Sequence, residues 1–213
     1  MNLTGAAPTA GVPGPLTAHA ALASWQFAPL VSGALTVAAA GYLLCAARVA
    51  RRHPARPWPA GRLLAFLAGL GVIAVATQSS IGVYDDVLFS DHMVQHVLLI
   101  MVAPPLLVSG SPVTLLMHVS RNPLHTWLKR AVRSRPVTAL TWPPGATALY
   151  CLVVGGTHTP PFMDLVLASD TVHNLEHALY LVTGYLFFLP VVGSEPIRWR
   201  MSIPAATWRY CWP

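Results

Sequence analysis

The chain has 213 residues, of which 54% are hydrophobic and only 9% are charged, and its formal net charge is +6. Soluble domains carry about 25% charged residues, so this composition excludes an ordinary water-soluble domain, whose surface needs more polar groups. The positive charge does not indicate nucleic-acid binding, because the basic residues fall in short segments between long apolar stretches.

Residues 1–28 carry no charged side chain and are interrupted by prolines at positions such as Pro8, Pro13 and Pro15. A secretory signal needs a basic region ahead of its apolar stretch, and this segment has none. We therefore expect residues 1–28 to form a flexible N-terminal arm, residues 29–193 a transmembrane helical domain, and residues 194–213 a cytoplasmic tail.

Five apolar stretches follow the arm, and each is near the length of about 20 residues that crosses a bilayer as a helix. They run over Leu30–Ala47, Leu63–Val83, His92–Val108, Val137–Gly156 and Val172–Val192. Backbone groups in lipid must be paired within the segment, which favours helices. The sequence therefore predicts an all-α, polytopic transmembrane helix bundle of about five spans. The prolines Pro143 and Pro144 predict a kink in the fourth span, and the more polar segment Pro112–Leu128 is expected at the inner membrane surface.

The connections between these stretches are sorted by charge. Basic residues gather between the first and second spans, between the third and fourth, and after the fifth. The outer connections hold acidic residues instead, namely Asp85, Asp86, Asp91, Asp164 and Asp170. Because basic loops stay on the cytoplasmic side, we expect a multi-pass protein of the plasma membrane with its N-terminus outside and its C-terminus inside.

Histidines gather at the expected outer ends of three spans. They are His92 and His96 in the third span, His158 at the end of the fourth, and His173 and His177 in the fifth. Two of these spans place their histidines at i and i+4, so both rings lie on one helix face with Cβ atoms about 5–6 Å apart. One histidine near a membrane surface is usually only a polar anchor, but two such pairs at one depth favour a shared metal or haem site.

Imidazole ligands suit copper, zinc, iron and nickel. Met93 would add a soft thioether that favours Cu(I), although packing is its simpler role. Glu176 would orient a ring or accept a proton, and ionisable groups inside a span tend to be functional. The predicted metal-site residues are therefore His92, His96, His158, His173, His177, Met93 and Glu176.

Other functions remain open at this point. Two histidines on facing helices can ligate haem in a membrane redox protein, and ionisable residues within spans can line a metal transport path. The crowding of the candidates at one face favours a surface site over a path through the membrane. The order His173-x-x-Glu176-His177 also matches an inverted zincin motif, but a position inside a span gives it no supporting context. We expect no enzymatic activity.

Several motifs resemble those of a known family. They are Phe89-Ser90-Asp91-His92-Met93-Val94-Gln95-His96, Ala103-Pro104-Pro105, Gly110-Ser111-Pro112, Thr157-His158, His173-Asn174-Leu175-Glu176-His177 and Gly193-Ser194-Glu195-Pro196. Together they resemble the signature of the CtaG-type assembly factors of caa3-type cytochrome c oxidase, over roughly residues 60–205.

The resemblance implies a multi-pass membrane protein that is needed to make an active haem–copper oxidase and is associated with copper supply. Cytochrome c oxidase subunits and the lipid bilayer are then the expected partners. The resemblance also implies about two further spans after the fifth, whereas this chain ends at Pro213. We therefore expect the C-terminus to be truncated relative to the family.

Overall fold

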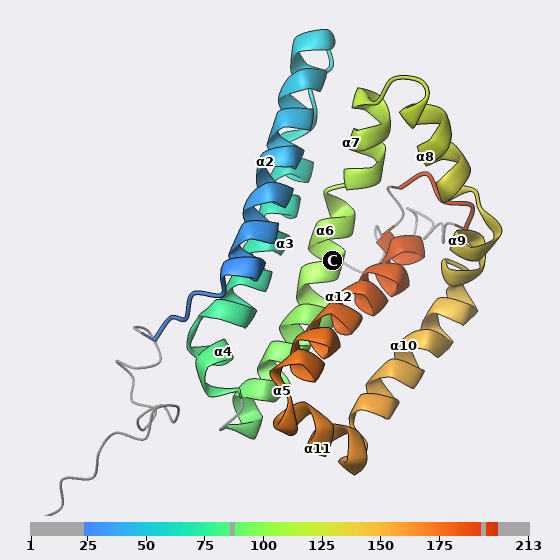
Figure 1. Cartoon of the computed structure of the whole chain (residues 1–213). Coiled ribbons are helices and arrows are strands. Elements are labelled where there is room, and N and C mark those ends of the chain that lie inside the picture. The colour runs from blue at the N-terminus through green and yellow to red at the C-terminus, as the bar shows by residue number, and fades with distance from the viewer. Residues whose placement is uncertain (1–23, 86–87, 193–194, 200–213) are drawn as a thin grey trace, which may run out of the picture.

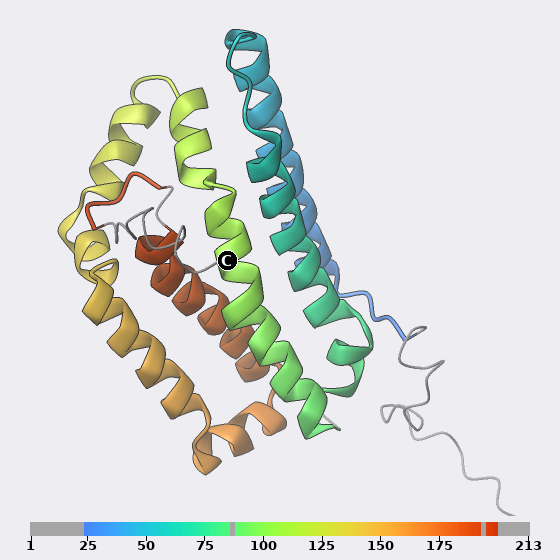
Figure 2. The ribbon, with the colours of Figure 1, turned by 180° about the vertical axis from the view of Figure 1, so that it is seen from behind.

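The computed structural model describes residues 24–85, 88–192 and 195–199. Helices joined by short connections make up this part of the chain, which contains no strand (Figures 1 and 2). The structure thus confirms the all-α helical bundle that the sequence predicts. Most of the expected N-terminal arm and of the expected tail lies outside the described residues.

The first two expected spans are α2 (Pro29–Arg52) and α3 (Ala60–Gln78), and α4 (Ser80–Tyr84) extends the second. α2 begins with a proline, which suits a first turn because no N–H donor is needed there. Ser79 separates α3 from α4, and its hydroxyl oxygen accepts a hydrogen bond from the N–H of Ile81 at 3.3 Å. This cap starts the short α4 at the end of the bundle where the histidines lie.

Gln26 ties the end of the expected arm to the turn between α3 and α4. Its backbone N–H donates to the carbonyl of Gln78 at 2.9 Å. Its side-chain amide donates to the carbonyls of Thr77 and Gly82, at 3.1 and 2.6 Å. Residues just before α2 are therefore held against the bundle rather than free of it.

The third span is composed of α5 (Phe89–Val97), the π-helical turn η1 (Leu98–Val102) and α6 (Ala103–Ser109). Pro104 has no N–H with which to bond the carbonyl of Ile100, as an α-helix would require. The wider π turn falls at this place, directly after the histidine pair of α5. Turns of this type recur next to functional sites.

The segment expected at the inner surface contains two different helices. α7 (Pro112–Val119) continues the third span, so that the apolar helical stretch runs over Phe89–Val119. α8 (Leu124–Val132) turns back from it (Figure 1). α8 buries none of its residues and carries Lys129 and Arg130 in its last turn, as a helix lying at a membrane surface would. α7 thus belongs to the long apolar stretch, and a position at the membrane surface stays a prediction for α8.

The fourth expected span is divided into α9 (Arg135–Leu140) and α10 (Pro143–Thr157). The break lies at Thr141 and Trp142, where the prolines predicted a kink. α10 alone is about 22 Å long at 1.5 Å per residue, which is less than a hydrocarbon core of about 30 Å. Within the described residues, 4 helical segments are long and apolar enough to cross a membrane, so a fifth crossing stays a prediction.

The last two helices are α11 (Pro160–Ala168), which lies across one end of the bundle, and α12 (Asp170–Val192), which packs between α6 and α10 (Figures 1 and 2). Gly184 of α12 lies against the π turn. A Cβ atom there would overlap the carbonyl oxygen of Ile100 and stand 2.7 Å from Cγ of Pro104. Only glycine therefore permits this approach, which fixes α12 against the helix that carries His92 and His96.

The two ends of the bundle differ in charge, as the sequence predicts. The end of α2, α7 and α8 carries the basic connections, whereas α4, α5, α11 and the start of α12 meet at the other end (Figure 1). Large apolar side chains project outward between these ends; Leu30, Val37 and Leu152 are more than 70% exposed. An apolar belt of this kind needs lipid around it.

Glu195, which follows α12, is buried against the start of α7. Its carboxylate accepts hydrogen bonds from the backbone N–H groups of Val113 and Thr114, at 2.9 and 2.8 Å, and from the Thr114 hydroxyl at 2.7 Å. The carboxylate thereby caps the N-terminus of α7 and joins the chain after α12 to the third span. Burial raises the pKa of this carboxyl, and the hydrogen bonds from Thr114 and Val113 oppose that effect.

Candidate metal centre

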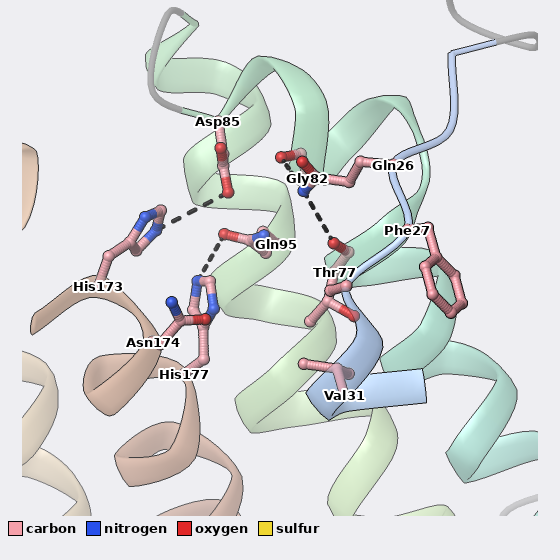
Figure 3. A pocket seen from close by; sticks show the side chains of 11 residues that line it. Gln26, Phe27, Val31, Thr77, Gly82, Asp85, Gln95, His173, Asn174 and His177 are labelled. Carbon is pink, nitrogen blue, oxygen red and sulfur yellow. Dashed lines mark hydrogen bonds and ion pairs between the residues drawn. The ribbon is translucent and has the colours of Figure 1, made fainter. Parts of the chain in front are cut away.

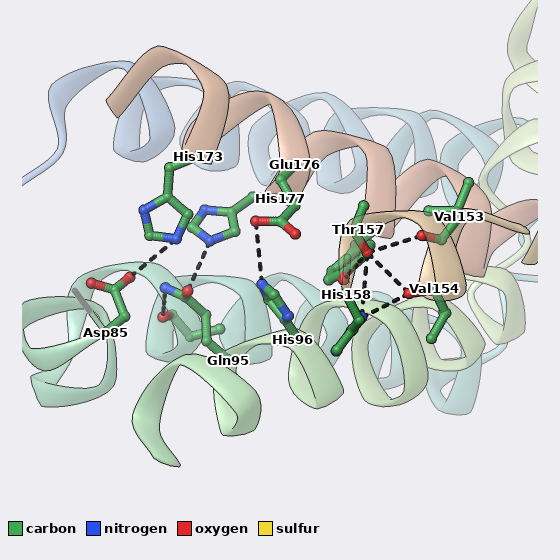
Figure 4. A network of polar contacts seen from close by, with 12 residues as sticks. Asp85, Gln95, His96, Val153, Val154, Thr157, His158, His173, Glu176 and His177 are labelled. Carbon is green, nitrogen blue, oxygen red and sulfur yellow. Dashed lines mark hydrogen bonds and ion pairs between the residues drawn. The ribbon is translucent and has the colours of Figure 1, made fainter. Parts of the chain in front are cut away.

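α5 and α12 begin at the same end of the bundle and present their histidine pairs to each other (Figure 4). The ring centroids of His92 and His96 are 4.1 Å apart, and those of His173 and His177 are 4.4 Å apart. Across the two helices, His92 lies 5.3 Å from His173 and His96 lies 6.4 Å from His177. Four rings from distant parts of the chain therefore share one level, as the sequence predicts.

Three of the side chains form a buried group that we call the inner trio: His92, His96 and Glu176. One ligand atom from each lies within 4.8 Å of the others. The His96 Nε2 atom is 3.5 Å from the Glu176 carboxylate, which is longer than a hydrogen bond of normal geometry. The three residues are only 2%, 4% and 2% exposed.

Most of the polar side-chain atoms of the inner trio have no hydrogen bond among the described residues. Both ring nitrogens of His92, both of His96 and one carboxylate oxygen of Glu176 are buried without a hydrogen-bond partner among the described residues. Buried polar atoms in folded proteins are almost always paired, and each that is left unpaired costs about 1–3 kcal/mol. A cation between the three residues would engage one ligand atom of each, whereas a packed core leaves these atoms without a partner.

A second group, which we call the outer trio, consists of Asp85, His173 and His177, again with one ligand atom of each within 4.8 Å of the others. His173 Nε2 lies 3.8 Å from the Asp85 carboxylate. His177 Nε2 is 2.8 Å from Oε1 of Gln95, whose amide nitrogen donates to the carbonyl of Ala76 at 2.9 Å. That second bond fixes the orientation of the amide, so the His177 Nε2–H donates and Gln95 accepts.

The two trios divide the motif His173-x-x-Glu176-His177 between them. On α12 the two histidines face Asp85, whereas Glu176 faces the histidine pair of α5 (Figure 4). An inverted zincin centre needs both histidines and the glutamate around one metal ion. The arrangement seen here is that of two neighbouring groups of side chains instead.

His158 and Met93, also predicted as ligands, lie beside the inner trio rather than in it. His158 ends α10 and is exposed; its ring is 6.0 Å from that of His96, and its Nδ1 bonds the carbonyl of Val154 at 2.7 Å. Met93 is half-buried on α5, about 100° around the helix axis from His92. The five-histidine layer is thus four packed rings with His158 at its edge.

Tyr180 closes the inner trio on the side of the bundle core. Its ring packs edge-on against His96 with centroids 4.4 Å apart. Its hydroxyl forms a 2.6 Å hydrogen bond with the hydroxyl of Thr157, and both residues are buried. This contact joins α10 to α12 and holds the His96 ring in place.

The sequence of this chain matches one known protein family. The profile of the family described as "Cytochrome c oxidase caa3 assembly factor (Caa3_CtaG)" matches residues 40–210, which is most of the chain. The chain belongs to this family. The resemblance predicted from the histidine motifs is therefore confirmed.

Similar proteins occur in mycobacteria. An uncharacterized protein of Mycobacterium bovis and one of Mycobacterium tuberculosis are each 33% identical to this chain over 200 residues, which cover 91% of the chain. One of Mycobacterium leprae is 29% identical over 182 residues, or 81% of the chain. The chain spans only about 30% of the length of these relatives. No solved structure matches it.

Sequence reasoning missed two residues that lie in or beside the two trios. Asp85 belongs to a loop whose acidic residues look like ordinary surface groups. Gln95 lies three residues after His92 and is 1% exposed. A polar amide on the same helix face as the histidines was a usable signal for Gln95, whereas only the packing of α4 against α5 reveals Asp85.

Proposed function

We propose that this assembly factor holds a copper ion at the inner trio and delivers it to a caa3-type cytochrome c oxidase as the oxidase is assembled. The observation that carries the proposal is the buried group of His92, His96 and Glu176, whose ring nitrogens have no hydrogen-bond partner among the described residues and whose ligand atoms, one from each residue, lie within 4.8 Å of one another. They come from two helices that are held together by close packing at Gly184, so the site keeps its shape without a metal.

The donor set supports copper as the cargo. Two imidazoles and one carboxylate suit divalent copper, which binds nitrogen and oxygen ligands more tightly than its neighbours in the first transition series. Cu(I) prefers thiolate or thioether ligands, and Met93, the soft donor that the sequence offered, lies beside the trio. We therefore propose Cu(II) as the ion that the trio holds, with Glu176 neutralising part of its charge.

The location follows from the distribution of charge. The inner trio lies at the end of the bundle opposite the basic connections, and basic loops stay in the cytoplasm. The proposed copper centre is then just beneath the outer surface of the plasma membrane. An oxidase subunit that docks there from within the bilayer would receive copper without its release into water, and no bond-making chemistry on an organic substrate is needed.

Haem fits this arrangement less well than an ion. Axial ligation by two histidines requires the flat macrocycle to lie between the two rings. The facing rings are His92 with His173, 5.3 Å apart between centroids, and His96 with His177, 6.4 Å apart. Gln95 already binds Nε2 of His177, and Tyr180 packs on His96 from the side. A macrocycle would have to separate helices that the Gly184 contact holds together.

Metal analysis of the purified full chain in lipid nanodiscs tests the proposal. We expect copper to be retained by the unchanged protein, and less copper to be retained by His96→Ala and by Glu176→Gln. His118→Ala is a matched control, because His118 is exposed at the basic end. Cells in which these variants replace the native protein should contain copper-deficient caa3 oxidase. Equal copper retention by all three variants, together with normal oxidase, would refute the proposal.

A further inference from the structure

The outer trio has a ligand set of the same kind as the inner trio, namely two imidazoles and one carboxylate. Its members come from two elements: Asp85 directly follows α4, and His173 and His177 stand one turn apart on α12. Asp85 and His173 are each only 7% exposed. The outer trio thus offers one carboxylate oxygen and two imidazole nitrogens that lie within 4.8 Å of one another. Three ligand atoms of these types are what a three-ligand metal site needs.

The two trios differ in how directly an ion from outside the protein can reach them. A cavity of about 300 Å³ opens beside the outer trio, and Asp85, His173 and His177 line it together with Gln26, Gln95 and Asn174 (Figure 3). No member of the inner trio lines this cavity. An ion that arrives through the cavity therefore meets the outer trio first.

A short step joins the two groups. The His92 and His173 rings are 5.3 Å apart between centroids. Gln95 stands between the pairs, because it lies on α5 beside His96 while its amide oxygen holds the His177 ring. An ion can thus exchange its ligands one at a time, from α12 to α5, without crossing an apolar gap.

We propose that Asp85, His173 and His177 form a second metal site, which takes up a divalent ion from the cavity and passes it to the inner trio. This inference rests on the proposed function of the inner trio as a copper centre. The ion keeps its oxidation state, since each lost bond to a nitrogen or oxygen atom is replaced by a similar one. Each trio supplies one negative charge, so the transfer leaves the local charge balance unchanged.

Cobalt(II) is a suitable probe, because its visible absorption reports its ligands and it is not reduced during the experiment. The full chain in lipid nanodiscs is mixed with Co(II), and both the number of ions bound and the rate of binding are measured. We expect two ions per chain. Glu176→Gln should bind one ion, at the faster of the two binding rates of the unchanged chain. Asp85→Asn should also bind one ion, but at a rate at least about tenfold lower.

Two further variants complete the design. Asp164→Asn removes an exposed carboxylate at the same end of the bundle and should bind two ions at the unchanged rates. Asp85→Glu keeps a carboxylate and should restore fast loading, which separates loss of a ligand from misfolding.

The outcomes separate the two proposals. A single ion per chain that needs Glu176 but loads equally fast in Asp85→Asn would overturn the second site and leave the copper centre standing. A single ion lost equally from both variants would also overturn it, in favour of one shared centre. A chain that binds neither cobalt nor copper would end both proposals.

Discussion

Replacing His92 by leucine removes two buried nitrogen atoms that have no hydrogen-bond partner within the described residues. Leucine is apolar, similar in volume and favourable in helices. In the metal-free protein, this substitution therefore removes an unsatisfied buried polar group. In the presence of copper, the same substitution removes one of the proposed ligands. The two effects on the free energy of unfolding have opposite signs.

The structure sets the expected magnitudes. An unsatisfied buried polar group costs about 1–3 kcal/mol, so metal-free His92→Leu should be more stable than the metal-free native protein by about that amount. A ligand present at about 100 times its dissociation constant stabilises the folded state by about 2.7 kcal/mol. Copper should therefore stabilise the native protein by this amount through the inner trio and should stabilise His92→Leu less.

Unfolding in mixed micelles, followed by circular dichroism as a denaturing detergent is added, measures these differences with and without copper. His118→Leu serves as a control, since His118 is exposed and its Nδ1 bonds the carbonyl of Thr114 at 2.8 Å; copper should stabilise this variant as it does the native protein. If metal-free His92→Leu is less stable than the native protein, or if copper stabilises it equally, the reasoning from unpaired atoms is wrong.

Three further predictions concern the surroundings of the site. Gly184→Ala should weaken both resistance to detergent and copper retention, because its methyl group overlaps a backbone carbonyl. Gly155→Ala has open space at its Cβ and should leave both properties intact. If the two variants resist detergent and retain copper equally well, the close approach at Gly184 is contradicted. Gln95→Leu should lower metal affinity about 10–100-fold in a copper titration by freeing the His177 ring. The pKa of the Glu195 carboxyl is raised above its usual 4.5, so the folded state holds this proton more firmly than the unfolded state does. The free energy of unfolding should therefore fall as the pH rises from about 4.5 through the raised pKa, by at most about 1.4 kcal/mol per pH unit. Unfolding curves at several pH values should show this part of the slope in the native protein and not in Glu195→Gln.

The sequence by itself determined the class of structure and the end of the bundle that carries the site. Apolar length and the sorting of charge are local or nearly local properties, so they can be read without knowing which helices touch. The i, i+4 spacing placed His92 with His96, and His173 with His177, because helix geometry fixes that relation. The motifs around these pairs then indicated the family to which the chain belongs.

Only the tertiary structure decided how these residues combine. Glu176 adjoins His173 and His177 along the chain but joins His92 and His96 in space, because it faces α5 while its neighbours face Asp85. Asp85 enters the outer trio because α4 folds against α5, and no periodicity in the sequence records that contact.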